Sequence, residues 1–208
     1  MFCALVLGYS CSQSKPEILA AELRLVYRQE TVAVGESFSL FALVQDDDGI
    51  SDLSDLYLIH DRSQLSWKLS SSDWIRVERS GQQWIGGHGL AMPDAEDPLP
   101  RGGFRLIAVD QGGERHEKPL AFDAPTLPSF DFPSLSLGKT SYEIRSAYPK
   151  NSFVLYDAQG ALLQTLQITN PSGPIAALNL PPAARAVALW AEDPAGSTAA
   201  LTKTQTLP

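Results

Sequence analysis

One segment of this sequence occurs in two similar copies, and this internal repeat constrains the fold more than any other feature. Residues 104–114 (FRLIAVDQGGE) reappear as residues 187–197 (VALWAEDPAGS). Leucine, alanine, aspartate and glycine recur at equivalent positions, so that Asp110 matches Asp193. In each copy an alternating apolar strand runs into an acidic, glycine-containing turn. The repeat predicts two copies of one β-rich module in tandem.

The length of 208 residues suits two small domains. Modules of roughly 80 to 110 residues are large enough for a β-sandwich to bury a core of its own. We expect a first domain at residues 22–123 and a second at residues 134–208. Residues 124–133 contain three prolines, which remove backbone donors and interrupt sheet pairing. We therefore expect a semi-rigid, Pro-rich linker there.

Short apolar runs between turn signals predict strands along the whole chain. No segment has a sustained helical period, and 15 glycines and 15 prolines are spread through the sequence, so we expect little helix. In the first module the expected strands are 23–27, 32–44, 56–60, 65–69, 74–78, 84–87, 104–109 and 116–122. In the second they are 141–145, 153–156, 162–168, 175–180, 187–191 and 199–204.

Several of these segments resemble bacterial immunoglobulin-like domains. The pattern Leu-x-Ala-x-Asp-x-x-Gly before the final strand is similar to their last hairpin, and residues 153–166 (FVLYDAQGALLQTL) are similar to their central hairpin. In the first module, residues 34–36 and 46–50 look like the second strand and the loop after it. The resemblance implies an all-β fold of two tandem antiparallel immunoglobulin-like β-sandwiches, a fold that serves adhesion, spacing or docking of a partner.

The N-terminal residues 1–16 (MFCALVLGYSCSQSKP) pass from an apolar run through small residues and a cysteine to a polar segment. This resembles the end of a bacterial lipoprotein signal peptide, with Cys11 as the lipidated residue and Cys3 removed with the signal. Residues 1–21 would then be a signal remnant and tether. In a bacterium with two membranes, the resemblance implies that Ser12 after the cysteine would permit sorting to the outer membrane. The alternative is an apolar N-terminal segment with an incidental thiol.

The formal net charge is −8, and the excess of acids lies entirely in the first module. Residues 12–127 hold 19 acids and 11 bases, whereas residues 128–208 hold five of each. The basic patches that nucleic-acid binding needs are absent from the sequence. Acidic surfaces also disfavour anionic lipid, so we expect membrane attachment only through the lipid anchor.

The densest polar cluster, residues 46–55, holds five aspartates. Carboxylates are ligands for calcium, but the EF-hand register fails because Val44 would occupy the first ligand position. In an immunoglobulin-like topology this loop lies at the same end as the last hairpin. The calcium candidates are therefore Asp46, Asp48, Asp110 and Glu114. The alternative, which we favour at this point, is that these residues only make turns and that no cofactor is bound.

Three tryptophans in the first module, Trp67, Trp74 and Trp84, are the candidate binding residues. Exposed on neighbouring strands they would form a platform for a sugar or protein, whereas core tryptophans are common in sandwiches. We expect two to be buried and one exposed.

No pattern in the sequence predicts a catalytic residue. His60, His88 and His116 do not have metal-ligand spacing, and the serines lack the Gly-x-Ser-x-Gly elbow of hydrolases. We therefore expect a non-enzymatic, lipid-anchored cell-envelope protein with a binding, adhesion or scaffolding role and a protein or glycan partner. The alternatives are a carbohydrate-binding accessory module of an envelope enzyme complex and, third, a hydrolase.

Overall fold

The computed structural model describes residues 14–29, 34–94, 97–125, 128 and 130–208. Two compact units form the chain, and each is built from separate stretches of sequence. Unit 1 consists of the residues up to Ala21, Ala42–Gly86 and Gly103–Leu120. Unit 2 consists of Glu22–Phe41, Gly87–Gly102 and Ala121–Pro208.

This division does not coincide with the predicted boundary at residues 124–133. Three long strands, β1 (Glu17–Gln29), β2 (Val34–Gln45) and β6 (Gln82–Leu90), contribute residues to both units. The N-terminal third of the chain is therefore shared between the units.

Unit 1 is organised around a four-stranded sheet in the order β4-β3-β7-β8. Its strands are β3 (Leu53–His60), β4 (Ser66–Ser70), β7 (Gly102–Asp110) and β8 (Arg115–Phe122), and β5 (Ile75–Arg79) pairs with the first half of β6. Side chains on β3 alternate between buried and partly exposed, as expected for strands with one face on a core. Leu56 lies opposite Ala108 and Leu58 opposite Leu106, and all four are buried.

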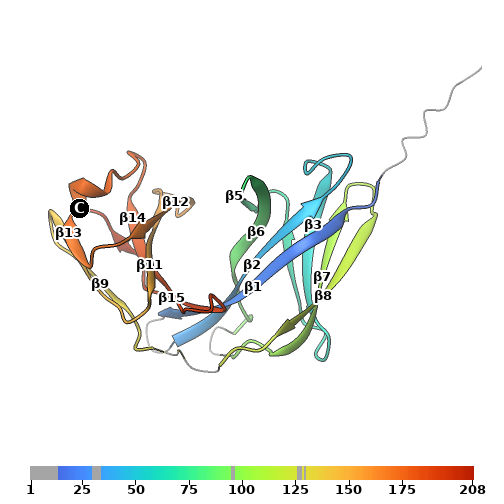
Figure 1. Cartoon of the computed structure of the whole chain (residues 1–208), viewed down its shortest axis with the longest axis horizontal. Helices are drawn as coiled ribbons and strands as arrows, with labels where there is room; N and C mark the ends of the chain where they lie inside the picture. The colour runs from blue at the N-terminus through green and yellow to red at the C-terminus, as the bar shows by residue number, and fades with distance from the viewer. Residues whose placement is uncertain (1–13, 30–33, 95–96, 126–127, 129) are drawn as a thin grey trace, which may run out of the picture. The chain divides into compact units, whose positions relative to one another are not determined.

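Unit 2 contains two sheets (Figure 1). The larger belongs to a nine-stranded sheet in the order β12-β11-β14-β15-β1-β2-β6-β5, with β16 on β14, of which β5 lies in unit 1. The smaller runs β13-β10-β9. The strands are β9 (Ser134–Leu137), β10 (Ser141–Arg145), β11 (Lys150–Tyr156), β12 (Leu162–Ile168), β13 (Ser172–Pro174), β14 (Ala186–Glu192), β15 (Thr198–Leu201) and β16 (Gln205–Thr206). Strand β1 joins β15 in parallel, with Leu25 opposite Thr198.

Apolar side chains of the two sheets of unit 2 pack against each other. The Tyr142 ring of β10 meets the Phe153 ring of β11 edge-on, with centroids 5.2 Å apart. Leu135 and Ile144 from the small sheet join Leu155 and Leu189 from the large one in the same core cluster. Two sheets stacked through alternate side chains form a β-sandwich-like arrangement, and the chain as a whole is all-β.

Both copies of the sequence repeat form a hairpin turn, and the second turn is one residue longer than the first. At the first turn the Asp110 amide donates to the Glu114 carbonyl, and at the second the Asp193 amide donates to the Thr198 carbonyl, each at 3.1 Å. Gly113 and the equivalent Gly196 have φ of +87° and +71°, a conformation that glycine adopts without a steric cost.

The expected strand at residues 175–180 is wrong. Ile175–Leu178 is a short 3-10 helix that follows Pro174 and ends at Asn179 with φ of +49°. The proline before it supplies no amide donor for strand pairing. Strands β9 and β13 were not expected. Within the described ranges, no helix is long and apolar enough to cross a membrane.

The described residues of the predicted linker belong to unit 2. Ala124 is buried, and Phe130 and Phe132 pack against the cluster that contains Tyr148 and Ala191. The Phe130 and Tyr148 rings lie 4.9 Å apart. Local proline content identified an irregular segment, but apolar contacts attach that segment to the sheet.

Candidate functional site

An acidic cluster lies in unit 1, where three strand ends meet. Asp46 follows β2, Asp52 precedes β3, and Asp110 ends β7. Each offers a carboxylate oxygen, and these oxygens all lie within 4.8 Å of one another. The Gln111 amide donates to the Asp52 carbonyl at 2.8 Å, which ties the hairpin turn to the loop. The backbone thus brings the three carboxylates together.

The loop that carries Asp46 and Asp52 is a pair of tight turns. The Gly49 amide donates to the Asp46 carbonyl at 3.0 Å, and the Asp52 amide donates to the Gly49 carbonyl at 2.9 Å. The Asp46 Oδ1 accepts the Asp48 amide at 2.9 Å. Gly49 has φ of +92°, so the sharp reversal needs glycine at this position.

One oxygen on each of the three carboxylates is buried without a hydrogen-bond partner in the described part of the chain. These atoms are the Oδ2 of Asp46, Asp52 and Asp110. The Asp110 side chain is the deepest, at 2 % exposure, and its other oxygen accepts the Glu114 amide at 2.8 Å. Burial raises the pKa of Asp52, and the carboxylates of Asp110, Asp46 and Asp48 raise it further.

The cluster overlaps the predicted calcium candidates but is not the same set. Asp46 and Asp110 come together. The Asp48 carboxylate instead accepts the backbone amide of Ser14 at 2.9 Å, and Glu114 contributes its backbone amide to Asp110. Asp52 was missed, although its place six residues after Asp46 on the same loop was visible in the sequence.

The three candidate tryptophans are each half-buried, so the expectation of two buried and one exposed is wrong. The Trp67 ring packs against Phe104, with centroids 6.4 Å apart. The Trp74 indole donates to the Leu69 carbonyl at 3.1 Å, and the Arg79 guanidinium lies 5.1 Å from the Trp84 ring centroid. Each indole is engaged by a different neighbour within its own unit.

The histidines also have separate environments. His60 is buried and its Nδ1 lies 2.7 Å from the Ser63 hydroxyl. The His88 Nδ1 lies 2.8 Å from the Ser39 hydroxyl. The His116 Nδ1 accepts a hydrogen bond from the Ile18 amide at 2.9 Å, and this bond joins β8 to the start of β1.

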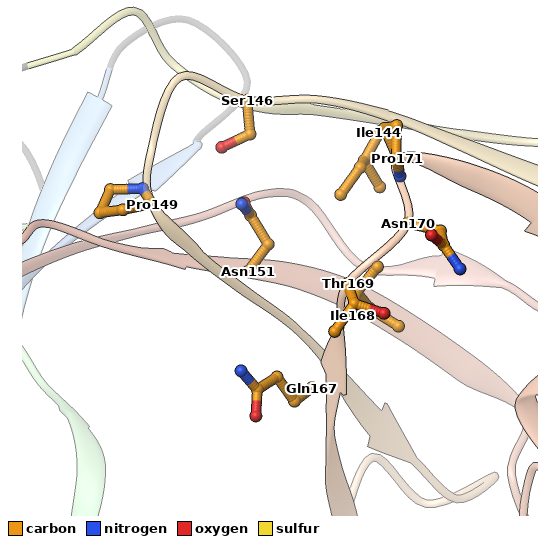
Figure 2. Close-up of a pocket in the computed structure, with 9 residues that line it drawn as sticks. All are labelled: Ile144, Ser146, Pro149, Asn151, Gln167, Ile168, Thr169, Asn170 and Pro171. Atoms are coloured by element: carbon orange, nitrogen blue, oxygen red, sulfur yellow. The ribbon is translucent and has the colours of Figure 1, made fainter.

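An open pocket of about 350 Å³ lies in unit 2, beside the end of β12. Figure 2 shows Asn151 and Gln167 among the residues that line it, and the Asn170 side chain directed away from them. The Asn151 amide nitrogen donates to the Tyr148 carbonyl at 2.8 Å, whereas its Oδ1 is buried without a partner in the described residues.

A second hollow of about 350 Å³ shares residues 167–170 with the first pocket and extends past Tyr142 toward the 3-10 helix. Both hollows are lined by amide and hydroxyl groups together with apolar side chains. The sequence analysis did not find this region, because it did not predict β13, which brings residues 172–174 beside β10.

Strand β12 lies at the end of the larger sheet, and its one strand neighbour in the described chain is β11. Its seven residues, LLQTLQI, include no charge and no proline. Natural edge strands usually carry charges, prolines or bulges that prevent pairing with another chain. Leu163 on this strand is also 38 % exposed. The pairing with β11 skips Leu163 at a bulge, and is regular from Gln164 to Ile168. This regular part of the outer edge of β12 is suited to accept a further strand.

Cys11, the predicted lipidation residue, lies outside the described residues.

No protein-family model and no curated protein matches this chain. Among solved structures, the chain is similar to dimeric latent PorU from Porphyromonas gingivalis, with 16 % sequence identity and a TM-score of 0.35. The match covers 92 % of this chain and 20 % of the PorU chain. The chain thus spans about a fifth of the length of that protein, and a likeness of this degree carries no argument about function.

Proposed function

We propose that this chain is a non-enzymatic, lipid-anchored protein of the bacterial cell envelope that binds an extended segment of a protein partner along β12. The observation that supports the binding mode is the outer edge of β12, which carries no charge or proline and is regularly paired on its inner side from Gln164 to Ile168. In β-strand addition, main-chain hydrogen bonds supply affinity and adjacent pockets select side chains. The pocket beside Asn151 and Gln167 provides such a selective contact.

Strand addition is tested by placing a charge on the edge. Extended peptides selected from a random library on the full chain are titrated against the Gln164→Lys variant. Gln164 is exposed on β12, so a lysine there should weaken peptide binding at least tenfold without disturbing the core. The matched control is Gln83→Lys, the same change at an exposed position of β6, which lies between β2 and β5. Equal affinity of both variants, or failure to select any peptide, argues against the proposal.

A second copy of this chain is the competing occupant of the edge. Sedimentation of the full chain over a range of concentrations separates the two cases. A dimer that dissociates on Gln164→Lys substitution would indicate self-association in place of a partner segment.

The envelope location is proposed from the sequence around Cys11. The lipid would anchor the protein to the outer membrane or to the periplasmic face of the envelope. Expression in a bacterial host with a labelled fatty acid should give label in the wild-type protein and none in Cys11→Ser. Label that persists in the variant would contradict the anchor.

A carbohydrate-binding role is the second candidate, and the amide-lined pocket favours it. The exposed Gln167 amide in the pocket lining can donate to and accept from sugar hydroxyls, and the half-buried Trp84 next to Arg79 is the alternative contact. Glycan-array binding that is lost in Gln167→Ala or Trp84→Ala, and retained in Gln164→Lys, would favour this role over strand addition.

The finer fold assignment is also a proposal, namely that the β-sandwich modules are immunoglobulin-like and arranged in tandem around the Pro-rich segment. The two equivalent hairpins at Asp110 and Asp193 support a repeated module. The parallel pairing of β1 with β15 places residues 25–28 in unit 2, so the modules would exchange an N-terminal strand. An experimental structure in which residues 22–123 and 134–208 form separate sandwiches would favour the simple tandem arrangement.

A further inference from the structure

We propose that a calcium ion binds between Asp46, Asp52 and Asp110 and joins the 46–52 loop to the 110–114 hairpin turn in unit 1. This site is independent of strand addition at β12, which belongs to unit 2. It also differs from the set expected from the sequence, because Asp52 takes part and Asp48 and Glu114 do not.

The first argument is that these carboxylates converge without a positive partner. Their oxygens lie within 4.8 Å of one another, and within the described ranges none of the three forms an ion pair with a lysine, arginine or histidine. Like charges at this distance repel, most strongly where water is excluded. A cation bound between the carboxylates attracts all three and offsets this repulsion.

The second argument is the burial of the Asp110 carboxylate, which does not depend on the repulsion between the three residues. Asp110 is 98 % buried, since its relative exposure is 2 %, and the oxygen that the Glu114 amide leaves free has no hydrogen-bond partner in the described residues. A buried carboxylate oxygen without a donor carries a desolvation penalty. A metal ion at the centre of the cluster removes that penalty for all three residues.

Coordination chemistry favours calcium over magnesium. Magnesium needs near-ideal octahedral geometry and keeps several waters, whereas calcium binds carboxylate oxygens at about 2.3–2.6 Å in flexible geometry. Oxygen separations within 4.8 Å are compatible with calcium. Calcium also tolerates irregular sets of six to eight oxygens, so loop carbonyls and water would complete its coordination. Zinc is disfavoured because the cluster offers neither histidine nor cysteine.

The Asp193 turn provides the matched comparison. In both turns the glycine amide donates to the aspartate carbonyl, and Asp193 is also buried with one oxygen unpartnered. Its other oxygen, however, accepts the Thr198 and Ser197 hydroxyls at 2.8 Å and 3.2 Å. Asp193 does not lie in a cluster of three acids among the described residues. Asp193→Asn therefore serves as a control that removes a buried turn carboxylate without removing a ligand of the proposed site.

The test is calorimetric titration of calcium chloride into the chelator-treated full chain, together with melting curves in 10 mM calcium or in chelator. We expect one site, with a dissociation constant on the order of 0.1–1 mM, the range of extracellular calcium modules. Because the ion binds only the folded state, the melting temperature should rise by several degrees. Magnesium should bind at least tenfold more weakly.

Variants locate the site. Asp52→Asn and Asp46→Asn should each weaken calcium binding at least tenfold and raise the melting temperature in chelator, because one negative charge is removed. Asp193→Asn should leave calcium affinity unchanged. Two results would overturn the proposal: an unaltered melting temperature with no heat of binding, or calcium binding that survives in both Asp52→Asn and Asp46→Asn. Peptide binding along β12 should be unaffected by these variants, so the failure of one proposal is distinguishable from the failure of the other.

Discussion

The guanidinium of Arg101 donates to both carboxylate oxygens of Glu36, with Nη1–Oε2 and Nη2–Oε1 distances of 2.7 Å and 2.8 Å. Glu36 lies on β2 and is buried. The same guanidinium donates to the carbonyls of Ala124 and Pro125 at 3.2 Å and 3.0 Å. Through Arg101, the loop before β7 is joined both to β2 and to the start of the Pro-rich segment, all within unit 2.

Removal of Arg101 should destabilise the protein strongly. Arg101→Met leaves the Glu36 carboxylate buried without its partner, and breaking a buried pair from one side costs about 3–5 kcal/mol. Urea unfolding of the full chain measures the loss. The double variant Arg101→Met with Glu36→Gln should recover part of it, because no charge then stays buried. A loss below about 1 kcal/mol in the single variant would show that the pair is solvated.

The stability of unit 2 should fall in strong alkali because of Tyr27. Its hydroxyl donates to the Pro125 carbonyl at 2.6 Å, and burial, with a further contribution from Glu36, raises the pKa of Tyr27 to about 12. An unfolded tyrosine ionises near pH 10, so the folded state binds the extra proton between the two values. The contribution of the protonated Tyr27 to the free energy of unfolding is therefore fully present below about pH 10. It is lost as the pH rises toward 12, which lowers the free energy of unfolding by about 2–3 kcal/mol.

The Tyr27→Phe variant isolates this effect, because other tyrosines also ionise in that range. The difference in unfolding free energy between wild type and variant should be constant from pH 7 to pH 9 and shrink above pH 10. A difference that is independent of pH up to 12 would contradict the prediction.

Substitution of the glycine at either hairpin turn should lower the stability of the protein, because the backbone there has a positive φ. Gly113 and Gly196 both have positive φ, and a Cβ at Gly113 would meet no atom within 4 Å. Alanine at Gly113 should therefore cost about 1 kcal/mol through backbone strain alone. Thermal unfolding measures the cost. Gly112→Ala, in the same turn but without a positive φ, should change stability by less than about 0.5 kcal/mol.

Residues 134–208 should not fold without the N-terminal strand. Strand β1 pairs with β15 from Leu25 to Arg28, and Val26 packs in one cluster with Trp190 and Ala199. Without β1 the fragment exposes this cluster and an unpaired strand edge. Amide NMR spectra of the fragment should lack the dispersion of the full chain. A well-dispersed spectrum would instead support the predicted domain boundary at residues 124–133.

The acidic residues of the candidate calcium site were partly predictable. The sequence placed Asp46 on a tight loop and Asp110 on a hairpin, because both turns depend on residues within four positions of one another. Their convergence with Asp52 also needs the hydrogen bond from Gln111 across to that loop. A contact between residues 59 positions apart leaves no local signature in a single sequence.

Local chemistry in the sequence determined the elements that need only near neighbours: alternating strands, Asp-x-x-Gly turns, and the break in pairing at the Pro-rich segment. Tertiary structure alone decided which segments share a core. Leu25 pairs with Thr198, and Phe130 and Phe132 pack against a buried cluster of unit 2. Burial of an apolar side chain is nearly non-directional, so a strand pattern specifies that a face will be covered but not which distant segment covers it.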